Sequence, residues 1–82
     1  LMDVFPQKLI NIEVKSRPDI FKIPKIMEAI KSTEQALGEE GRVLVRYSGT
    51  QNICRIMVEG PSLEITEKYC RQIADVVKIE IG

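Results

Sequence analysis

The sequence contains no histidine and no tryptophan, and its formal net charge is +0, with 12 basic and 12 acidic residues. Without histidine, this chain cannot build a Ser-His-Asp triad, a Cys-His dyad or a histidine-ligated zinc site. A protein that mainly binds DNA or RNA usually has a strong excess of basic residues, so no nucleic-acid partner is expected. The balanced charge still allows a local basic site.

Cysteine is also scarce. Cys54 and Cys70 have neither CxxC spacing nor a histidine partner, whereas a secreted domain of this size more often carries four to eight cysteines. We expect two reduced thiols in a cytoplasmic protein, with a disulfide as the alternative. No apolar run approaches the ~18 residues of a membrane-spanning helix, and no signal-peptide order is present, so no membrane partner is expected. The first residues, from Leu1, are expected to be the tail of a preceding segment.

The remaining composition is that of an ordinary globular domain, with 44% hydrophobic and 29% charged residues in 82. This length corresponds to one small domain, or to a piece of a longer protein.

Three segments have the pattern of β-strands. Residues 9–15 alternate with period two, which places Ile10, Ile12 and Val14 on one face. Residues 42–46 and 53–59 are rich in β-branched residues and should form a hairpin. Residues 78–81 alternate again and could add a short fourth strand.

Two segments have the pattern of amphipathic helices. The first begins at about Pro24 and ends at Gly38, because proline suits a first helical turn and glycine suits a helix end. The second begins after Ser62, a favourable N-cap residue. Its inner face is expected to carry Thr66, Cys70, Ile73 and Val77, helped by Tyr69 and Val76.

The order of elements is therefore β-α-β-β-α, possibly with a final β. It predicts a two-layer α+β domain in which two helices cover one face of an antiparallel sheet. The other face of the sheet and the loops remain for function.

One loop has the residues of an anion site. Arg46 ends the second strand, Ser48, Gly49 and Thr50 follow, and Arg55 lies in the returning strand. Glycine lets a loop turn so that its N–H groups converge on an anion, hydroxyls add donors, and an arginine fork matches phosphate or carboxylate oxygens. The alternative is a plain hairpin loop with solvated arginines.

No catalytic residue is expected. Ser48 has no base in this chain to activate it as a nucleophile. The glutamates have no spacing that demands a metal, so a solvated surface is the simpler interpretation: Glu39, Glu40, Glu59 and Glu64. Cys70, on an apolar helix face, is expected to be core.

Residues 42–61, RVLVRYSGTQNICRIMVEGP, resemble the C-terminal phosphate-binding loop of the α-D-phosphohexomutases. That family has an arginine, any residue, Ser-Gly-Thr, then an arginine and a glutamate in the next strand. Two further stretches, FPQKLINIEVK and RIMVEG, resemble the branch that acts on glucosamine phosphates. Many members have proline, glutamate and proline where this chain has Tyr47, Gln51 and Asn52. The matching residues here are Arg46, Ser48, Gly49, Thr50, Arg55 and Glu59.

The resemblance implies that residues 1–82 are the fourth, C-terminal domain of a longer phosphohexose mutase, with a TBP-like fold. It implies a phosphoserine, a Mg²⁺ site and a sugar-recognition loop on three earlier domains, and no cofactor in this one. This domain would clamp the non-reacting phosphate of the phosphosugar through Arg46, Ser48, Gly49, Thr50 and Arg55, and would be inactive alone.

Three alternatives stay open from the sequence. The order of elements also allows a ferredoxin-like arrangement. The parent enzyme could be a phosphomannomutase or phosphoglucomutase relative, because no motif here reads the sugar. Finally, the chain could be a stand-alone module that binds a protein through its open sheet face.

Overall fold

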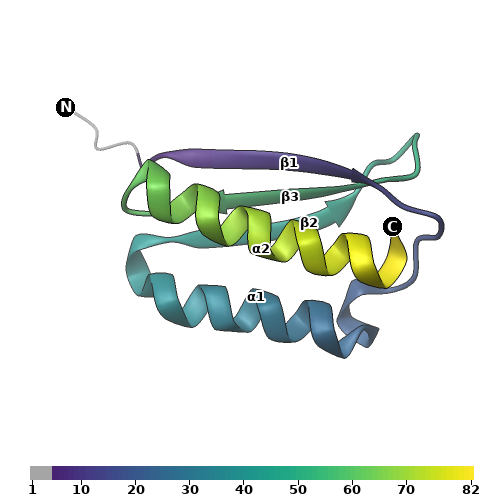
Figure 1. The fold of residues 1–82 in the computed structure, drawn as a ribbon, viewed down its shortest axis with the longest axis horizontal. Coiled ribbons are helices and arrows are strands. Elements are labelled where there is room, and N and C mark those ends of the chain that lie inside the picture. The colour runs from purple at the N-terminus through teal and green to yellow at the C-terminus, as the bar shows by residue number, and fades with distance from the viewer. Residues whose placement is uncertain (1–4) are drawn as a thin grey trace.

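The computed structural model describes residues 5–82, in which three strands and two long helices are connected by short segments (Figure 1). Leu1 and the rest of the expected tail of a preceding segment lie outside the described residues. In chain order the elements are β1 (Gln7–Glu13), η1 (Ile20–Lys22), α1 (Pro24–Leu37), η2 (Gly38–Glu40), β2 (Arg42–Tyr47), β3 (Ile53–Glu59) and α2 (Leu63–Ile81).

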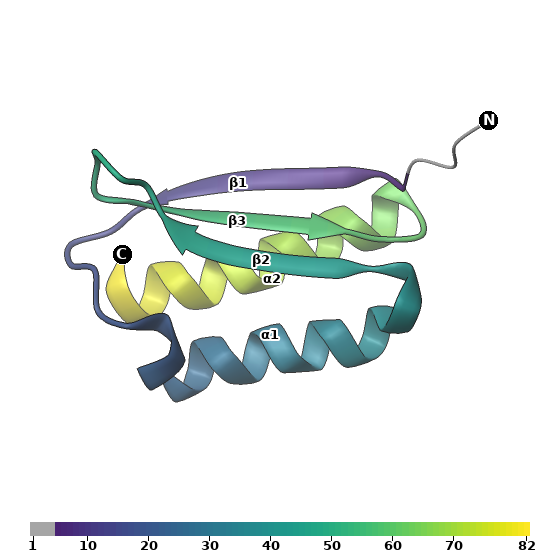
Figure 2. The ribbon, with the colours of Figure 1, turned by 180° about the vertical axis from the view of Figure 1, so that it is seen from behind.

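The sheet has the order β1-β3-β2, and both strand pairs are antiparallel. Both helices lie on one side of it, as the two opposite views show (Figures 1 and 2). The two-layer α+β prediction and the β2–β3 hairpin are therefore confirmed. The other side of the sheet, called the open face below, is not covered by any described element.

The core forms between the helices and the inner face of the sheet. Alternation works as predicted in β1, where Ile10 and Ile12 face inward and Val14 just beyond the strand is buried. Cys54, Ile56 and Val58 supply the inner face of β3. From α2, the predicted stripe is buried together with Ala74: Thr66, Cys70, Ile73 and Val77.

The helix ends follow the predicted capping residues. Pro24 is the first residue of α1, and Gly38 after its end has a φ of 60°, in the left-handed region that favours glycine. At the start of α2, the Ile65 N–H donates to the Ser62 hydroxyl oxygen at 3.3 Å.

The possible fourth strand at residues 78–81 was wrong, because α2 continues to Ile81. Helical spacing places Ile81 one turn after the buried Val77, so the inner stripe continues, and Ile79 points outward with 78% of its surface exposed. The Ile81 carbonyl accepts from the Lys15 N–H at 2.8 Å. Without that strand, the sheet described for residues 5–82 lacks the fourth strand of a ferredoxin-like arrangement.

Both cysteines are free thiols and buried, which confirms the reduced state expected of them. Burial raises the pKa of Cys54 and of Cys70, so both resist ionisation. This environment is that of core residues, as expected for Cys70, and not of reactive thiolates. Among residues 5–82, neither long helix combines the length and apolar character that a membrane span requires.

Candidate anion-binding site

The strand register arranges the side chains of the open face in rows that cross all three strands. We call the row at the β2–β3 loop the loop row and the one at the opposite end the distal row; an apolar row separates them. The loop row is Asn11, Arg55 and Arg46; the apolar row is Leu9, Met57 and Leu44; the distal row is Gln7, Glu59 and Arg42.

Two arginines stand directly opposite each other in the loop row. Arg46 on β2 is the register partner of Arg55 on β3, and both side chains are exposed. Residues opposite each other in an antiparallel pair have Cβ atoms about 4.5–5.5 Å apart, and like charges there are destabilising. The one ion pair found within residues 5–82 joins Arg71 to Glu67 on α2, so no carboxylate salt bridge offsets this repulsion. A bound anion would offset it.

Asn11 holds one of these arginines. Its Oδ1 accepts from the Arg55 Nε at 3.4 Å, a long hydrogen bond between neighbouring strands. Because Nε is the inner nitrogen of the guanidinium, the two terminal nitrogens of Arg55 keep their donors for a ligand. The sequence argument missed Asn11. Its position on the polar face of the first strand was visible, but its place beside Arg55 depends on the strand order.

The loop closes tightly at its base. The Ser48 N–H donates to the Ile53 carbonyl at 2.8 Å, and the Thr50 N–H approaches the Ser48 hydroxyl oxygen at 3.4 Å. Gly49 is exposed, and a Cβ added to it would meet nothing within 4 Å. The loop therefore brings Ser48, Gly49 and Thr50 to the end of the sheet where Arg46 and Arg55 lie.

The backbone of the loop glycine does not lie in the left-handed region. Within residues 5–82 the glycine with a positive φ is Gly38, and Gly49 has none. Gly49 instead leaves space beside the main chain. This space suits the approach of a ligand to the loop backbone.

Two contacts near the loop were not anticipated. The Tyr47 hydroxyl donates to the Pro18 carbonyl at 2.6 Å, and Arg17 Nη1 donates to the Ser48 carbonyl at 3.2 Å. Arg17 and Arg46 also line the same open hollow beside β2. In the sequence, Arg17 and Pro18 indicated only a break after the first strand, because contacts across about 30 residues leave no local signal.

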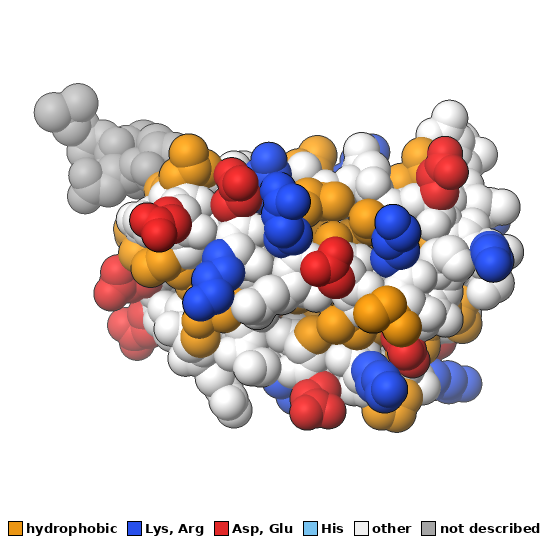
Figure 3. All heavy atoms as spheres, in the orientation of Figure 1, with side chains coloured by type: hydrophobic (Ala, Val, Ile, Leu, Met, Phe, Trp, Pro, Cys, Tyr) orange, Lys and Arg blue, Asp and Glu red, His pale blue; other side chains and the backbone are white. Residues whose placement is uncertain are grey.

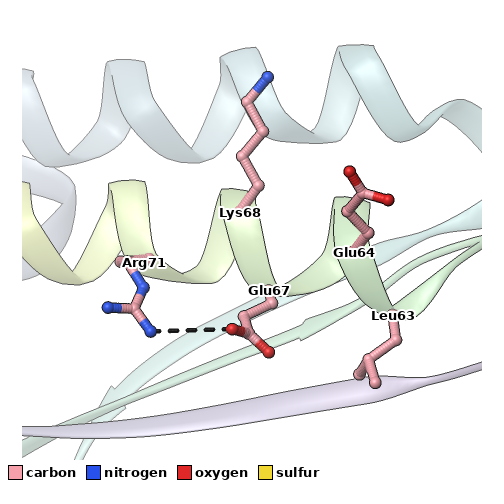
Figure 4. Close-up of a pocket in the computed structure, with 5 residues that line it drawn as sticks. All are labelled: Leu63, Glu64, Glu67, Lys68 and Arg71. Atoms are coloured by element: carbon pink, nitrogen blue, oxygen red, sulfur yellow. Dashed lines mark ion pairs between the residues drawn. The ribbon is translucent and has the colours of Figure 1, made fainter.

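The outer side of the helices has a different charge pattern. Acidic and basic side chains alternate over it without a patch of one sign (Figure 3). The hollow on α2 in Figure 4 follows this pattern: Glu67 pairs with Arg71 at 3.8 Å, while Glu64 and Lys68 point away from that pair. In residues 5–82 no group of three or more His, Cys, Asp or Glu side chains is placed to hold a metal.

Comparison with known proteins adds to this geometry. The fold is similar to that of solved N-acetylglucosamine-phosphate mutase, a member of the α-D-phosphohexomutase superfamily, with a TM-score of 0.78 at 22% identity over 90% of this chain and 15% of that one. It is also similar to the N-acetylphosphoglucosamine mutase of Aspergillus fumigatus, solved with GlcNAc-6P and magnesium (TM-score 0.77, 23% identity, 90% of this chain, 16% of that one).

Sequence similarity is higher among curated proteins. The chain is 74% identical over its whole length to the phosphoglucosamine mutase of Syntrophobacter fumaroxidans and 66% identical to that of Syntrophus aciditrophicus. It spans 18% of the length of each of these relatives. The family model of the phosphoglucomutase/phosphomannomutase C-terminal domain matches residues 9–76, which include Arg46, Arg55 and the whole β2–β3 loop. The chain therefore belongs to the phosphoglucomutase/phosphomannomutase C-terminal domain family.

Proposed function

We propose that this chain is the phosphate-binding domain of a phosphoglucosamine mutase. In this role it clamps the non-reacting phosphate of glucosamine 6-phosphate or glucosamine 1-phosphate, and of the bisphosphate intermediate. The relatives at 74% and 66% identity carry this enzyme name, which supports the choice of substrate. The enzyme would be an isomerase of cytoplasmic amino-sugar biosynthesis.

The observation that carries this proposal is the opposed pair Arg46 and Arg55. Two guanidinium groups on one face can offer several N–H donors to a phosphate. The hydroxyls of Ser48 and Thr50 and the backbone at Gly49 lie in the loop that joins their two strands. Such donors recognise a phosphate and not a sugar, so the same clamp serves both orientations that the substrate adopts between the half-reactions.

The chemistry of the transfer belongs to other domains in this proposal. Phosphoryl transfer depends largely on positioning and on charge stabilisation, and a clamp on the distal phosphate supplies orientation. As the family resemblance implies, the Mg²⁺, the phosphoserine and the sugar-recognition loop would lie on the three preceding domains of the enzyme. The isolated domain is expected to be inactive.

Kinetics of the full-length enzyme test the proposal. Each charge-assisted contact contributes roughly 1.5–3 kcal/mol, so Arg46→Ala or Arg55→Ala should weaken phosphosugar binding by about ten- to a hundredfold, mainly through KM. Wild-type KM and kcat in both variants would contradict the proposal. Comparing glucosamine, mannose and glucose phosphates as substrates would decide between this enzyme and a phosphomannomutase or phosphoglucomutase.

A second candidate function has one observation in its favour. Leu9 and Leu44 of the apolar row are 52% and 43% exposed, so the open face could bind a protein partner. Amide NMR of the chain during a titration with inorganic phosphate separates the two functions. Shifts confined to residues 46–55 support the clamp, whereas no shifts at millimolar phosphate support the interaction module.

A further inference from the structure

The segment between β1 and η1 passes along the loop and bonds to it on both sides. The Val14 N–H donates to the Asn52 carbonyl at 2.9 Å, at the end of the loop. Arg17 Nη1 donates to the Ser48 carbonyl at 3.2 Å, at its beginning. We call residues 14–20, which end on the first residue of η1, the strap. Figure 2 shows this connection and the loop at the same end of the sheet.

A third hydrogen bond runs in the opposite direction. The Tyr47 hydroxyl, on the last residue of β2, donates to the Pro18 carbonyl at 2.6 Å. Burial, followed by the charges of Cys54 and Asp19, raises the pKa of Tyr47, so the hydroxyl keeps the proton that it donates. The strap therefore donates to both ends of the loop and accepts from the strand residue directly before it.

The strap itself is fixed at both ends. Val14 and Ile20 are 6% and 8% exposed and belong to the core. Between them, the Lys15 N–H donates to the Ile81 carbonyl at 2.8 Å, which joins the strap to the last turn of α2. At the other end, Asp19 caps η1 by accepting from the Phe21 N–H at 3.0 Å. A strap anchored in this way can hold a loop in place.

The loop needs such support. Residues 49–52 are all exposed. The loop's own hydrogen bonds are the one from the Ser48 N–H to the Ile53 carbonyl, which closes its base, and the 3.4 Å approach of the Thr50 N–H to the Ser48 hydroxyl oxygen. Exposed loops with few packed contacts sample many conformations, and ordering them on binding costs free energy. A preformed loop avoids most of this cost and so binds its ligand more tightly.

We propose that Arg17 and Tyr47 are positioning residues that hold the phosphate-binding loop in its binding conformation. This proposal rests on the proposed function of the loop. The Arg17 side chain acts through the Ser48 carbonyl, and the Tyr47 hydroxyl acts through the Pro18 carbonyl. Pro18 adds stiffness, because its ring fixes its own φ and restricts the backbone of Arg17.

Two single variants separate positioning from a simple effect of charge. Tyr47→Phe removes one hydroxyl, changes no charge and keeps the ring packed. Arg17→Met removes the bond to Ser48 and one positive charge near the loop. If both residues position the loop, each variant weakens binding of inorganic phosphate by roughly three- to tenfold, the effect of one ordinary hydrogen bond. Arg42→Met, which removes an equal charge in the distal row, should leave the affinity within about twofold.

The second readout is independent of phosphate. Amide hydrogen exchange and ¹⁵N relaxation at residues 48–52 of the ligand-free chain should show a more mobile loop in Tyr47→Phe and in Arg17→Met, with unchanged signals in α1. Arg17→Lys, which keeps the positive charge and a hydrogen-bond donor on a flexible side chain, should restore part of both the order and the affinity.

The outcomes are distinct. If Arg46→Ala abolishes phosphate binding but Tyr47→Phe has wild-type affinity and wild-type loop order, the positioning role is wrong and the clamp stands. If only Arg17→Met loses affinity, with an ordered loop, Arg17 is a phosphate ligand and positioning is overturned. If Arg46→Ala binds phosphate like the wild type, the proposed function is wrong, and the positioning role that rests on it is wrong as well.

Discussion

The two ends of the open face differ in how their charges are matched. In the distal row, Gln7 Nε2 donates to a Glu59 carboxylate oxygen at 2.8 Å, and Arg42 is the register partner of Glu59. In the loop row, the same two strands place Arg46 against Arg55. Both rows cross the same strands on the same face. The distal row contains one charge of each sign, whereas the loop row holds two positive charges that a bound anion would compensate, as the proposed clamp requires.

Reversing the charge of one arginine should have the largest effect. Arg46→Glu would place a carboxylate opposite Arg55, and so make the loop row resemble the distal row. We expect binding of inorganic phosphate to fall on the order of a hundredfold or more, because an attractive charge becomes repulsive. Replacing a like-charge pair by an opposite pair should also raise the free energy of unfolding by roughly 0.2–1 kcal/mol. NMR titration and urea denaturation measure the two effects.

The matched control is Arg42→Glu, which puts two carboxylates opposite each other in the distal row. It should lower the free energy of unfolding and leave phosphate binding almost unchanged. If Arg46→Glu and Arg42→Glu changed the free energy of unfolding in the same direction, the different pairing of charges in the two rows would not explain the stability of the variants.

The two ends should also differ in their tolerance of a methyl group. Beside the distal row, a Cβ added at Gly41 would clash with the Leu37 Cβ and lie 2.7 Å from the Glu59 carbonyl oxygen, whereas one at Gly49 in the loop meets nothing within 4 Å. We expect Gly41→Ala to lower the free energy of unfolding by about 1–3 kcal/mol through overpacking. Gly49→Ala should stay within about 0.5 kcal/mol of the wild type. Equal denaturation midpoints for the two variants would contradict this difference.

A smaller effect is expected from pH. Burial raises the pKa of Cys54, which lies next to Arg55 in β3, and of Cys70 on α2. Above an ordinary thiol pKa of about 8.5, the unfolded chain releases protons that the folded chain keeps, so the free energy of unfolding should fall as pH rises and stay constant below that pH. Urea denaturation between pH 7 and pH 10 measures this slope. Cys54→Ala and Cys70→Ala should each reduce it, and an unchanged slope in both would contradict the assignment.

The sequence predicted the parts of this fold that depend on local pattern. Residues 53–59 became β3 with the predicted bounds, and Pro24, Gly38 and Ser62 lie at the helix ends where they were expected. The alternation of residues 78–81 was misleading, because a segment this short does not distinguish a strand from a helix. Ile81 lies four residues after Val77 and so also continues the apolar stripe of α2.

The sequence predicted which residues are candidates for the site, but not how they are arranged in space. Strand alternation indicated that Arg46 and Arg55 could face the same side, and the register shows them directly opposite each other. Asn11, Arg17 and Tyr47 could not be placed around the loop, because their contacts join segments 29–44 residues apart and depend on the strand order. Whether Ser48, Gly49 and Thr50 bind phosphate stays a prediction.

The most direct test of the account compares two arginines of one strand. Arg42 and Arg46 are both exposed on the open face of β2, one in each row. Dissociation constants for inorganic phosphate, measured by amide NMR at constant ionic strength, should rise about tenfold or more in Arg46→Ala and by less than about twofold in Arg42→Ala. An equal change in the two variants would show that the loop row is not a specific phosphate site, and would contradict the account.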